Sequence, residues 1–426
     1  MAGISKTEAN GTAARAAAEA VDQERLWRRL MTLAEIGATP RGGVNRQALT
    51  AEDAEARRLM VEWGEALGLT PLTDAIGNLY LRRDGSDPEA APVMTGSHLD
   101  SQPLGGKFDG AYGVMAGLEA LEAMNVAGTE TRRPIELVAW TNEEGGRFQP
   151  GVMGSGVFAG EMALADLLPI TDREGVSVGT ALGAFLAATP AVPTRESGFP
   201  VAAYIEAHIE QGPLLEAVGK PIGVVESVQG LRWYAIEVRG EAAHAGTTPR
   251  RHRKDALKAA VAMVSALEEA MADDADTVRF TVGRFEVEPG SPNTVPNRVL
   301  FTIDFRHPDQ ATIDRLTDRI EPLCQANARG CAVTVTRTSN EPPTLFDPEV
   351  VATVERWRQA LALDGMAMTS GAGHDAMVMA RHCPSGMIFV PCEKGVSHNE
   401  VEAATPSDLA AGARVLTAAL VDLASR

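Results

Sequence analysis

The stretch GSHLDSQPLGGKFDG, residues 96–110, decides the fold of this chain and the place of its site. It follows an apolar run at residues 91–95, which is typical of a buried β-strand. His98 and Asp100 stand at the end of that run, and Asp109 follows in a glycine-rich loop. A strand that ends in this way directs a ring nitrogen and carboxylate oxygens towards one region, as a metal ion requires. The stretch therefore predicts a ligand site at the end of a strand.

A second acidic stretch occurs in the same context. The apolar run at residues 135–140 is followed by Glu143 and Glu144 within TNEEGG, and a further apolar run at 204–209 carries His208. Open α/β sheets bind ligands at the carboxyl ends of their strands. These strands therefore indicate one site at the edge of such a sheet.

Strand and helix segments alternate through the first half of the chain. The apolar patterns predict strands at residues 93–98, 135–140 and 204–209, and helices at residues 23–36, 51–67 and 113–124. Thr50 is a typical cap for the second of these helices. The alternation predicts an α/β fold with a mixed, mainly parallel sheet covered by helices.

The pattern changes from about residue 222, where strands follow one another directly. We expect strands at residues 224–228 and 232–238, a helix at 254–271, strands at 278–286 and 299–306, a helix at 310–327 and a strand at 331–336. This order predicts a compact α+β insertion. The expected organisation is a flexible leader at residues 1–20, a main domain at 21–221 and 339–426, and the insertion at 222–338.

The composition excludes several classes of protein. The chain has 426 residues and a formal charge of −18, which argues against nucleic-acid binding because nucleic acids select basic surfaces. No apolar run approaches the roughly 18 residues of a membrane span, and the Ala-rich start lacks an apolar signal core. Four cysteines without CxxC spacing are typical of reduced thiols. We expect a cytoplasmic protein that binds neither nucleic acid nor membrane.

Five residues form the predicted metal site. They share a place at a strand end or in a polar loop: His98, Asp109, Glu144, His208 and His398. A His/carboxylate set without cysteine suits a hydrolytic site for zinc, manganese, cobalt or nickel ions. Each residue taken alone is more often a hydrogen-bonded core or surface group, so the prediction depends on their combination. The alternative is a metal-free acidic protein that binds a small ligand or a partner.

The motifs and their order resemble those of a known family. GSHLDSQPLGGKFDGAYGV, TNEEGGRF, EAHIEQGP, HAGTTP and SHNE are similar to motifs of the M20 metallopeptidase superfamily, in its carbamoyl-amino-acid and allantoate amidohydrolase branch. The resemblance extends from about residue 25 to the C-terminus. It implies a catalytic domain with two divalent metal ions per subunit, and an inserted lid domain of ferredoxin-like topology that also forms a homodimer.

The resemblance implies a role for each residue of the metal site. Asp109 resembles the carboxylate that bridges both ions. His98 and His208 resemble ligands of one ion, whereas Glu144 and His398 resemble ligands of the other. A bridging carboxylate holds two ions roughly 3.5–4 Å apart, close enough to share one water.

Three further residues resemble catalytic groups of the family. Glu143 corresponds to the general base beside the ions, and Asp100 to the carboxylate that orients His98 through its other ring nitrogen. His244 resembles the residue that reaches across the dimer to polarise the substrate carbonyl.

Other residues resemble groups that bind the substrate. Asn293 and Arg306 correspond to residues that hold its α-carboxylate, for which the planar fork of arginine is suited. From the residues alone, a turn residue and a surface cation remain alternatives. Gln211 and Gly373 match positions that line the substrate, the glycine through its backbone. The basic run at residues 250–254 departs from the family pattern, and we interpret it as a solvated loop.

The function that the resemblance implies is hydrolysis of the carbamoyl carbon–nitrogen bond of N-carbamoyl-L-amino acids. Allantoate amidohydrolase and β-ureidopropionase are alternatives that share every metal ligand. An aminoacylase or dipeptidase of the same superfamily is a further alternative.

Overall fold

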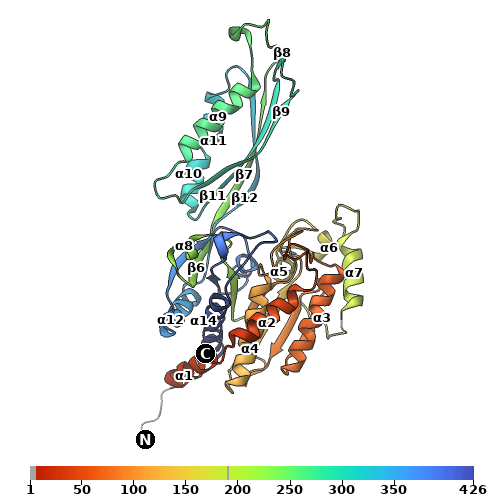
Figure 1. Cartoon of the computed structure of the whole chain (residues 1–426), viewed down its shortest axis with the longest axis vertical. Helices are drawn as coiled ribbons and strands as arrows, with labels where there is room; N and C mark the ends of the chain where they lie inside the picture. The colour runs from red at the N-terminus through yellow and green to blue at the C-terminus, as the bar shows by residue number, and fades with distance from the viewer. Residues whose placement is uncertain (1–5, 190) are drawn as a thin grey trace. The chain divides into compact units, whose positions relative to one another are not determined.

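The structure is a computed structural model that describes residues 6–189 and 191–426, and it divides into two compact units (Figure 1). Unit 1 comprises Met1–Glu226 and Leu345–Arg426, and unit 2 comprises Ser227–Thr344. The insertion thus begins and ends several residues later than the predicted 222–338. The reason is that β6 (Ile222–Val228) pairs with β15 (Ser385–Val390) in the sheet of unit 1.

Unit 1 is built on a nine-stranded sheet whose main path runs in the order β1-β2-β4-β3-β5-β15-β6-β13, with β14 also paired to β6. The four central strands β4, β3, β5 and β15 run parallel, whereas β2 and β6 are antiparallel to their central neighbours. This confirms the predicted mixed, mainly parallel sheet. Its strands are β1 (Thr70–Thr73), β2 (Leu79–Arg83), β3 (Val93–His98), β4 (Ile135–Trp140), β5 (Ala203–Ile209), β6, β13 (Thr344–Leu345), β14 (Gly365–Ser370) and β15.

The central strands are buried along their whole length, as expected for parallel strands covered on both faces. Alternate residues such as Leu137 and Ile205 join the core formed with α4 (Ala111–Val126) and α14 (Pro406–Ala424). The residues between them, which include Glu206 and His208, point to the opposite face because side chains alternate along a strand. Further helices of unit 1 are α2 (Gln23–Ala34), α3 (Ala51–Ala66), α5 (Met153–Phe158), α6 (Leu164–Leu167), α7 (Val178–Ala188), α8 (Leu214–Val218), α12 (Pro348–Ala360) and α13 (Asp375–Met379).

The N-terminal segment differs from the predicted flexible leader. Residues Lys6–Glu19 form helix α1, and Ala14, Ala17 and Ala18 are fully buried in the core of unit 1. Alanine at this spacing lets a helix approach its neighbour α14 closely without any large apolar side chain. The prediction was therefore wrong for these residues, whereas residues 1–5 lie outside the described part of the chain.

Unit 2 has a four-stranded antiparallel sheet in the order β12-β7-β11-β9. Its chain order is β7 (Gly230–Arg239), α9 (Ala256–Met271), β9 (Arg279–Glu288), β11 (Arg298–His307), α10 (Gln310–Thr317), α11 (Ile320–Ala326) and β12 (Ala332–Glu341). This βαββαβ order is the ferredoxin-like topology. The predicted helix at residues 310–327 is two helices, which are separated at Asp318 and Arg319.

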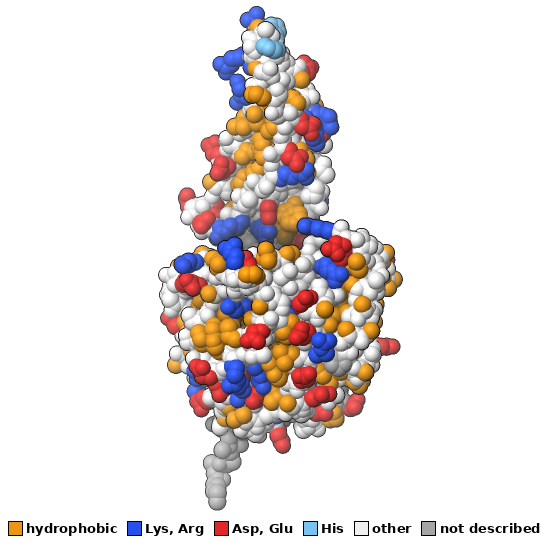
Figure 2. Space-filling view, turned by 45° about the vertical axis from the view of Figure 1, so that its right-hand side comes forward, with side chains coloured by type: hydrophobic (Ala, Val, Ile, Leu, Met, Phe, Trp, Pro, Cys, Tyr) orange, Lys and Arg blue, Asp and Glu red, His pale blue; other side chains and the backbone are white. Residues whose placement is uncertain are grey.

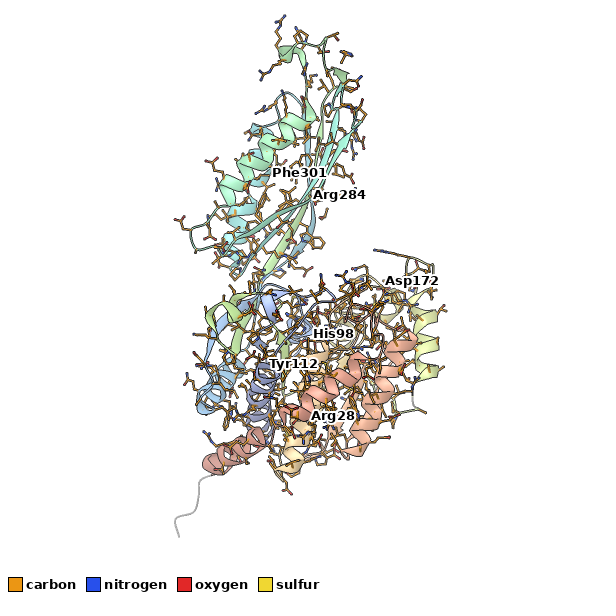
Figure 3. All side chains as sticks on the ribbon, viewed as in Figure 1. Arg28, His98, Tyr112, Asp172, Arg284 and Phe301 are labelled. Atoms are coloured by element: carbon orange, nitrogen blue, oxygen red, sulfur yellow. The ribbon has the colours of Figure 1, made fainter. Side chains whose placement is uncertain are left out.

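The helices of unit 2 cover one face of its sheet (Figure 1). Along β11 every second residue is buried, and Phe301, labelled in Figure 3, belongs to the apolar core between sheet and helices. This alternation marks a sheet with one covered face. Within the described residues, none of the helices combines the length and the apolar character that a membrane crossing needs.

Candidate metal centre

Three neighbouring parallel strands bring the site residues to one edge of the sheet. His98 is the last residue of β3, Glu143 and Glu144 follow β4, and His208 lies near the end of β5. Asp109 precedes α4 in the glycine-rich loop. This is the arrangement predicted from the ends of the apolar runs. His98, which is labelled in Figure 3, is buried in unit 1.

The five predicted metal ligands converge in two groups that share Asp109. His98, Asp109 and His208 form one group, and Asp109, Glu144 and His398 form the other, with ligand atoms within 4.8 Å of one another in each. Asp109 Oδ1 lies 3.2 Å from His208 Nε2, and its Oδ2 lies 3.2 Å from His398 Nε2. A carboxylate that directs one oxygen into each group is placed to bridge two cations.

The electrostatics of the groups fit divalent cations. Burial, followed by the charge of Asp109, raises the pKa of Glu144 to about 8. The hydrogen bond with Asp109 raises the pKa of His398 to about 9, and the same partner, against the effect of burial, raises the pKa of His208 to about 9. Buried carboxylates of this kind need a positive charge nearby. Two divalent cations held by these groups would supply it.

The ring orientations of two histidines are fixed by backbone carbonyls. His98 Nδ1 lies 2.8 Å from Asp100 O, and His208 Nδ1 lies 2.8 Å from Ile209 O. When Nδ1 carries the proton, Nε2 presents its lone pair to the centre of the site.

The placement of Asp100 corrects the role that the resemblance implied. Its carboxylate Oδ1 is 3.9 Å from His98 Nδ1, so the backbone carbonyl, and not the carboxylate, orients His98. The carboxylate instead accepts hydrogen bonds from the backbone N–H groups of Glu143 and Glu144, each at 3.2 Å. The reason is that the loop after β4 passes close to Asp100. The residue therefore fixes the acidic loop.

Glu143 lies beside the ligand groups and in neither of them. Its Oε2 is 3.4 Å from His98 Nε2. Burial, followed by the charges of Asp375 and Glu144, raises the pKa of Glu143 well above its usual value. A carboxyl with a raised pKa next to a cation site is suited to accept and return a proton.

Several supporting residues were missed in the sequence. Glu402 accepts backbone hydrogen bonds from Phe108 at 2.8 Å and Asp109 at 3.1 Å, and a bond from Ser397 Oγ at 2.9 Å. A Cβ at Gly106 would lie 2.0 Å from Glu402 Cδ, so the position requires glycine. The Gly105-Gly106 pair was the sequence signal for a close contact at this loop. The sequence does not show that the contact partner is Glu402, which lies 294 residues after Phe108.

Glu144 and Asp109 have further partners. Gln102 holds Glu144 through its backbone N–H at 3.0 Å and its side chain at 2.9 Å. Gln211, predicted to line the substrate, donates from Nε2 to Asp109 Oδ2 at 3.0 Å. Among the described residues, a Cβ at Gly373 would meet only Met377 Cε, at an ordinary contact distance of 3.7 Å, so no described atom blocks a side chain there.

Unit 2 brings together only two of the three residues predicted there. His244 in β8 (Ala243–His244) pairs with β10 (Thr294–Val295), and Ala245 N donates to Asn293 O at 2.9 Å. Strand β11 begins at Arg298, directly after β10, whereas Arg306 lies near its other end. The strand between these two residues spans roughly 25 Å. Its guanidinium pairs with Asp304 at 2.8 Å. Asn293 and Arg306 of one chain therefore do not bind the same carboxylate group.

The basic run at residues 250–254 divides into two kinds of residue. Arg253 donates to Thr248 O at 2.8 Å and to Ala245 O at 2.6 Å, and thus supports the loop after His244. Arg250, Arg251 and His252 are exposed. Figure 2 shows Lys, Arg and His side chains gathered at that end of unit 2. The interpretation as a solvated loop holds for the exposed residues and fails for Arg253.

Comparisons with known proteins agree with the fold and identify the family. The family model of peptidase family M20/M25/M40 matches residues 94–422. N-carbamoyl-L-amino-acid amidohydrolase of Rhizobium meliloti is 42% identical over 95% of this chain and 97% of its own length. Allantoate amidohydrolase of Escherichia coli is 34% identical over 92% and 96%. The structure of an amidase of the hydantoinase/carbamoylase family from Burkholderia multivorans superposes with a TM-score of 0.90, at 45% identity over 95% and 98%.

The fold, the two ligand groups that share Asp109 and these relatives define a hydrolase that acts on carbon–nitrogen bonds other than peptide bonds. Within this class, the chain belongs to the M20 peptidase family.

Proposed function

We propose that this protein is a binuclear metal-dependent amidohydrolase that cleaves the carbamoyl carbon–nitrogen bond of N-carbamoyl-L-amino acids. The observation that carries the proposal is the pair of ligand groups that share Asp109, with Glu143 beside them. The similarity to N-carbamoyl-L-amino-acid amidohydrolases supports the substrate class. The bond cleaved is thus a linear amide and not a peptide bond.

The residues that would hold the two ions are those of the two ligand groups, with Asp109 in both. Zinc, manganese, cobalt and nickel ions all accept such ligands. Divalent ions bound there supply Lewis-acid polarisation of the carbonyl and lower the pKa of a bound water.

Glu143 acts as the general base. It accepts a proton as the water oxygen bonds to the carbamoyl carbon, and it returns that proton to the amino nitrogen as the carbon–nitrogen bond breaks. The products are the free amino acid and carbamate, which decomposes to carbon dioxide and ammonia. Asp100 fixes the loop that carries Glu143, so the base keeps its direction towards the reacting atoms.

His244, Asn293 and Arg306 bind the organic part of the substrate. Because Asn293 and Arg306 lie at opposite ends of the β11 region, a single unit 2 does not place both on one substrate. Two chains can do so. We therefore propose a homodimer in which Arg306 comes from one chain, and His244 and Asn293 come from its partner, with unit 2 as lid and dimerisation domain. Gln211 and Gly373 line the site from unit 1, and a cytoplasmic location stays a prediction.

Metal analysis and kinetics test the proposal. Purified protein should contain two divalent ions per chain, lose hydrolase activity on chelation and regain it when metal is restored. Glu143→Gln should keep both ions and lose about 10³-fold in kcat. A protein with the same activity before and after chelation would contradict the metal-dependent mechanism and favour a simple binding protein.

A substrate panel separates the alternatives. N-carbamoyl-L-amino acids should be hydrolysed with a higher kcat/KM than 3-ureidopropionate, allantoate, N-acetyl amino acids or dipeptides. A kcat/KM for allantoate that exceeds all others by orders of magnitude would assign the protein to the allantoate branch.

A further inference from the structure

Two buried arginines in unit 1 take no part in the proposed mechanism. Arg46 and Arg57 are each only 2% exposed. Arg46 precedes helix α3, and Arg57 belongs to it. A buried guanidinium needs hydrogen-bond partners for its N–H groups. Each of the two binds a backbone carbonyl where a strand leads into residues of the candidate metal centre.

Arg57 uses all of its donors at the end of β4. Its five acceptors are Gly77 O (2.7 Å), Ala139 O (3.0 Å), Trp140 O (3.0 Å), Thr141 Oγ1 (3.3 Å) and Asp53 Oδ1 (3.3 Å). A guanidinium has five N–H groups in a fixed planar arrangement, whereas a lysine has three donors on one atom. The side chain at this position therefore has to be an arginine if all five acceptors are to be bound.

The acidic loop starts from the residues that Arg57 binds. Trp140 is the last residue of β4, and two positions later Asn142 adopts a φ of 54°. This left-handed conformation turns the chain. Glu143 and Glu144 follow directly after the turn. Arg57 therefore fixes the point from which both carboxyl groups are directed.

Arg46 fixes the corresponding segment after β3. Its Nε donates to Leu99 O at 2.8 Å, and its backbone N–H donates to Ser101 Oγ at 2.9 Å. Ser101 N donates in return to Arg46 O at 2.8 Å. Asp100 lies between these two partners, and its carbonyl oxygen is 2.8 Å from His98 Nδ1. Arg46 therefore holds the peptide segment that orients the ring of His98.

The two arginines support different ligand groups. Arg46 acts on the segment that orients His98, and Arg57 acts on the loop that carries Glu144. Among the hydrogen bonds of the described residues, Arg57 makes none with the segment after β3, and Arg46 makes none with the loop after β4. The loss of one arginine should therefore disturb one group more than the other.

We infer that Arg46 and Arg57 are positioning residues, each for a different metal ion of the centre. Arg46 sets the direction of His98 in one ligand group, and Arg57 sets the place of Glu144 in the other group. The inference rests on the proposed binuclear centre. Carboxylates from both loops approach one another there, and like charges at short distance repel. A guanidinium bound to the backbone of each loop opposes this repulsion.

Zinc titration of the metal-free full chain tests the inference without a measurement of activity. Wild-type protein should bind two zinc ions. Arg57→Lys keeps the positive charge and should lower the affinity for one ion by about 10- to 100-fold, the usual cost when a group that positions a ligand is lost, while the other affinity stays within about threefold. Arg46→Lys should have the same pattern with the other ion affected.

A ligand variant identifies the affected ion. Glu144→Ala should bind a single zinc ion tightly, at the group that contains His98. In this background Arg57→Lys should change the remaining affinity by less than about threefold, because the ligand that it positions is already gone. Arg46→Lys in the same background should lower that affinity by about 10- to 100-fold.

A matched arginine controls for general loss of stability. Arg25 lies in α2 and pairs with the buried Glu119 at 2.6 Å, and neither residue belongs to a ligand group. Arg25→Lys should lower Tm and leave both zinc affinities unchanged.

Two milder variants keep the test valid if a lysine variant does not fold. Thr141→Val removes one acceptor of Arg57, and Ser101→Ala removes one partner of Arg46. Each should lower the affinity for its own ion by about threefold, the usual effect of a single hydrogen bond.

The outcomes that contradict the inference are distinct. It is overturned if Arg57→Lys weakens both ions alike or neither, if both lysine variants weaken the same ion, or if Arg25→Lys weakens zinc binding as strongly. Wild-type protein that binds no zinc would refute the proposed binuclear centre itself.

Discussion

The sheets of the two units differ in how many of their faces are covered. In unit 1 the central strands β3, β4 and β5 are buried at every position, and both faces are covered. In unit 2 the strand β11 alternates between buried and half-buried residues, and helices cover one face only. A sheet covered on both faces can bury charged groups at its edge, whereas a half-covered sheet presents them to solvent.

The site residues of the two units differ in the same way. In unit 1, His98 and Asp109 are buried and held by hydrogen bonds within the unit. In unit 2, His244 and Asn293 are exposed, and Arg306 is separated from them along β11. Unit 1 therefore contains a preorganised centre. Unit 2 presents residues that, in the proposed homodimer, complete a site only together with another chain.

The largest effect is expected from a substitution that disrupts the candidate metal centre of unit 1. Asp109→Ala removes the ligand that both groups share. We expect loss of bound metal and a fall in kcat/KM of roughly 10³-fold or more, since the loss of a supporting partner alone typically costs 10–100-fold. Metal analysis and steady-state kinetics measure this. The control is Asp87→Asn, at an exposed pair with Arg132, and retention of both ions by Asp109→Ala would contradict a bridging role.

The second effect tests whether unit 2 works across chains. His244→Ala and Arg306→Ala should each be nearly inactive as pure proteins. When equal amounts are unfolded and refolded together, mixed dimers each regain one intact site, so roughly a quarter of the wild-type activity should return. If the mixture stays inactive although mixed dimers form, all three unit 2 residues act from one chain, and the two units do not differ in this way.

A third effect concerns the packing that supports Asp109. Gly106→Ala places a Cβ 2.0 Å from Glu402 Cδ and should lower the free energy of unfolding by about 1–3 kcal/mol, together with metal affinity. Gly183→Ala is the matched control, because a Cβ there meets nothing within 4 Å in helix α7. The control should be neutral or stabilising by about 0.5–1 kcal/mol. Denaturant unfolding measures the free energy of unfolding of both variants. Equal values for Gly106→Ala and Gly183→Ala would contradict a clash between the added Cβ and Glu402.

The smallest effect is the pH dependence of the metal-free protein. The pKa of Glu144 is raised to about 8, by burial and then by Asp109, and the pKa of His398 is raised to about 9 by its hydrogen bond with Asp109. Groups with raised pKa stabilise the fold at low pH, and this stabilisation is lost as the pH rises through those values. The Tm of chelated protein should therefore fall by a few degrees between about pH 5 and pH 9.

The metal-loaded protein provides the comparison for this experiment. Bound cations replace the protons, so its Tm should change less over the same range. Thermal unfolding of unit 1 is the transition to follow. If Tm changes with pH in the same way with and without chelator, Glu144 and His398 do not cause the pH dependence of stability.

The sequence by itself determined the mixed, mainly parallel sheet, the insertion and the five residues of the candidate metal centre. Apolar runs of strand length and ligand-type residues at their ends are local features, so they can be recognised before any tertiary contact is known. Helix α1 was not predicted, because its residues in the apolar core are alanines, which leave no amphipathic pattern of large apolar residues.

Only the tertiary structure decided which groups support the ligands and how far apart the substrate residues lie. Asp100 touches the Glu143 loop instead of directing its carboxylate to His98, Glu402 closes on the loop of Asp109, and Asp375 meets Ser155. These contacts join residues up to 294 positions apart. No local pattern encodes them, because they follow from the packing of elements that the sequence specifies separately.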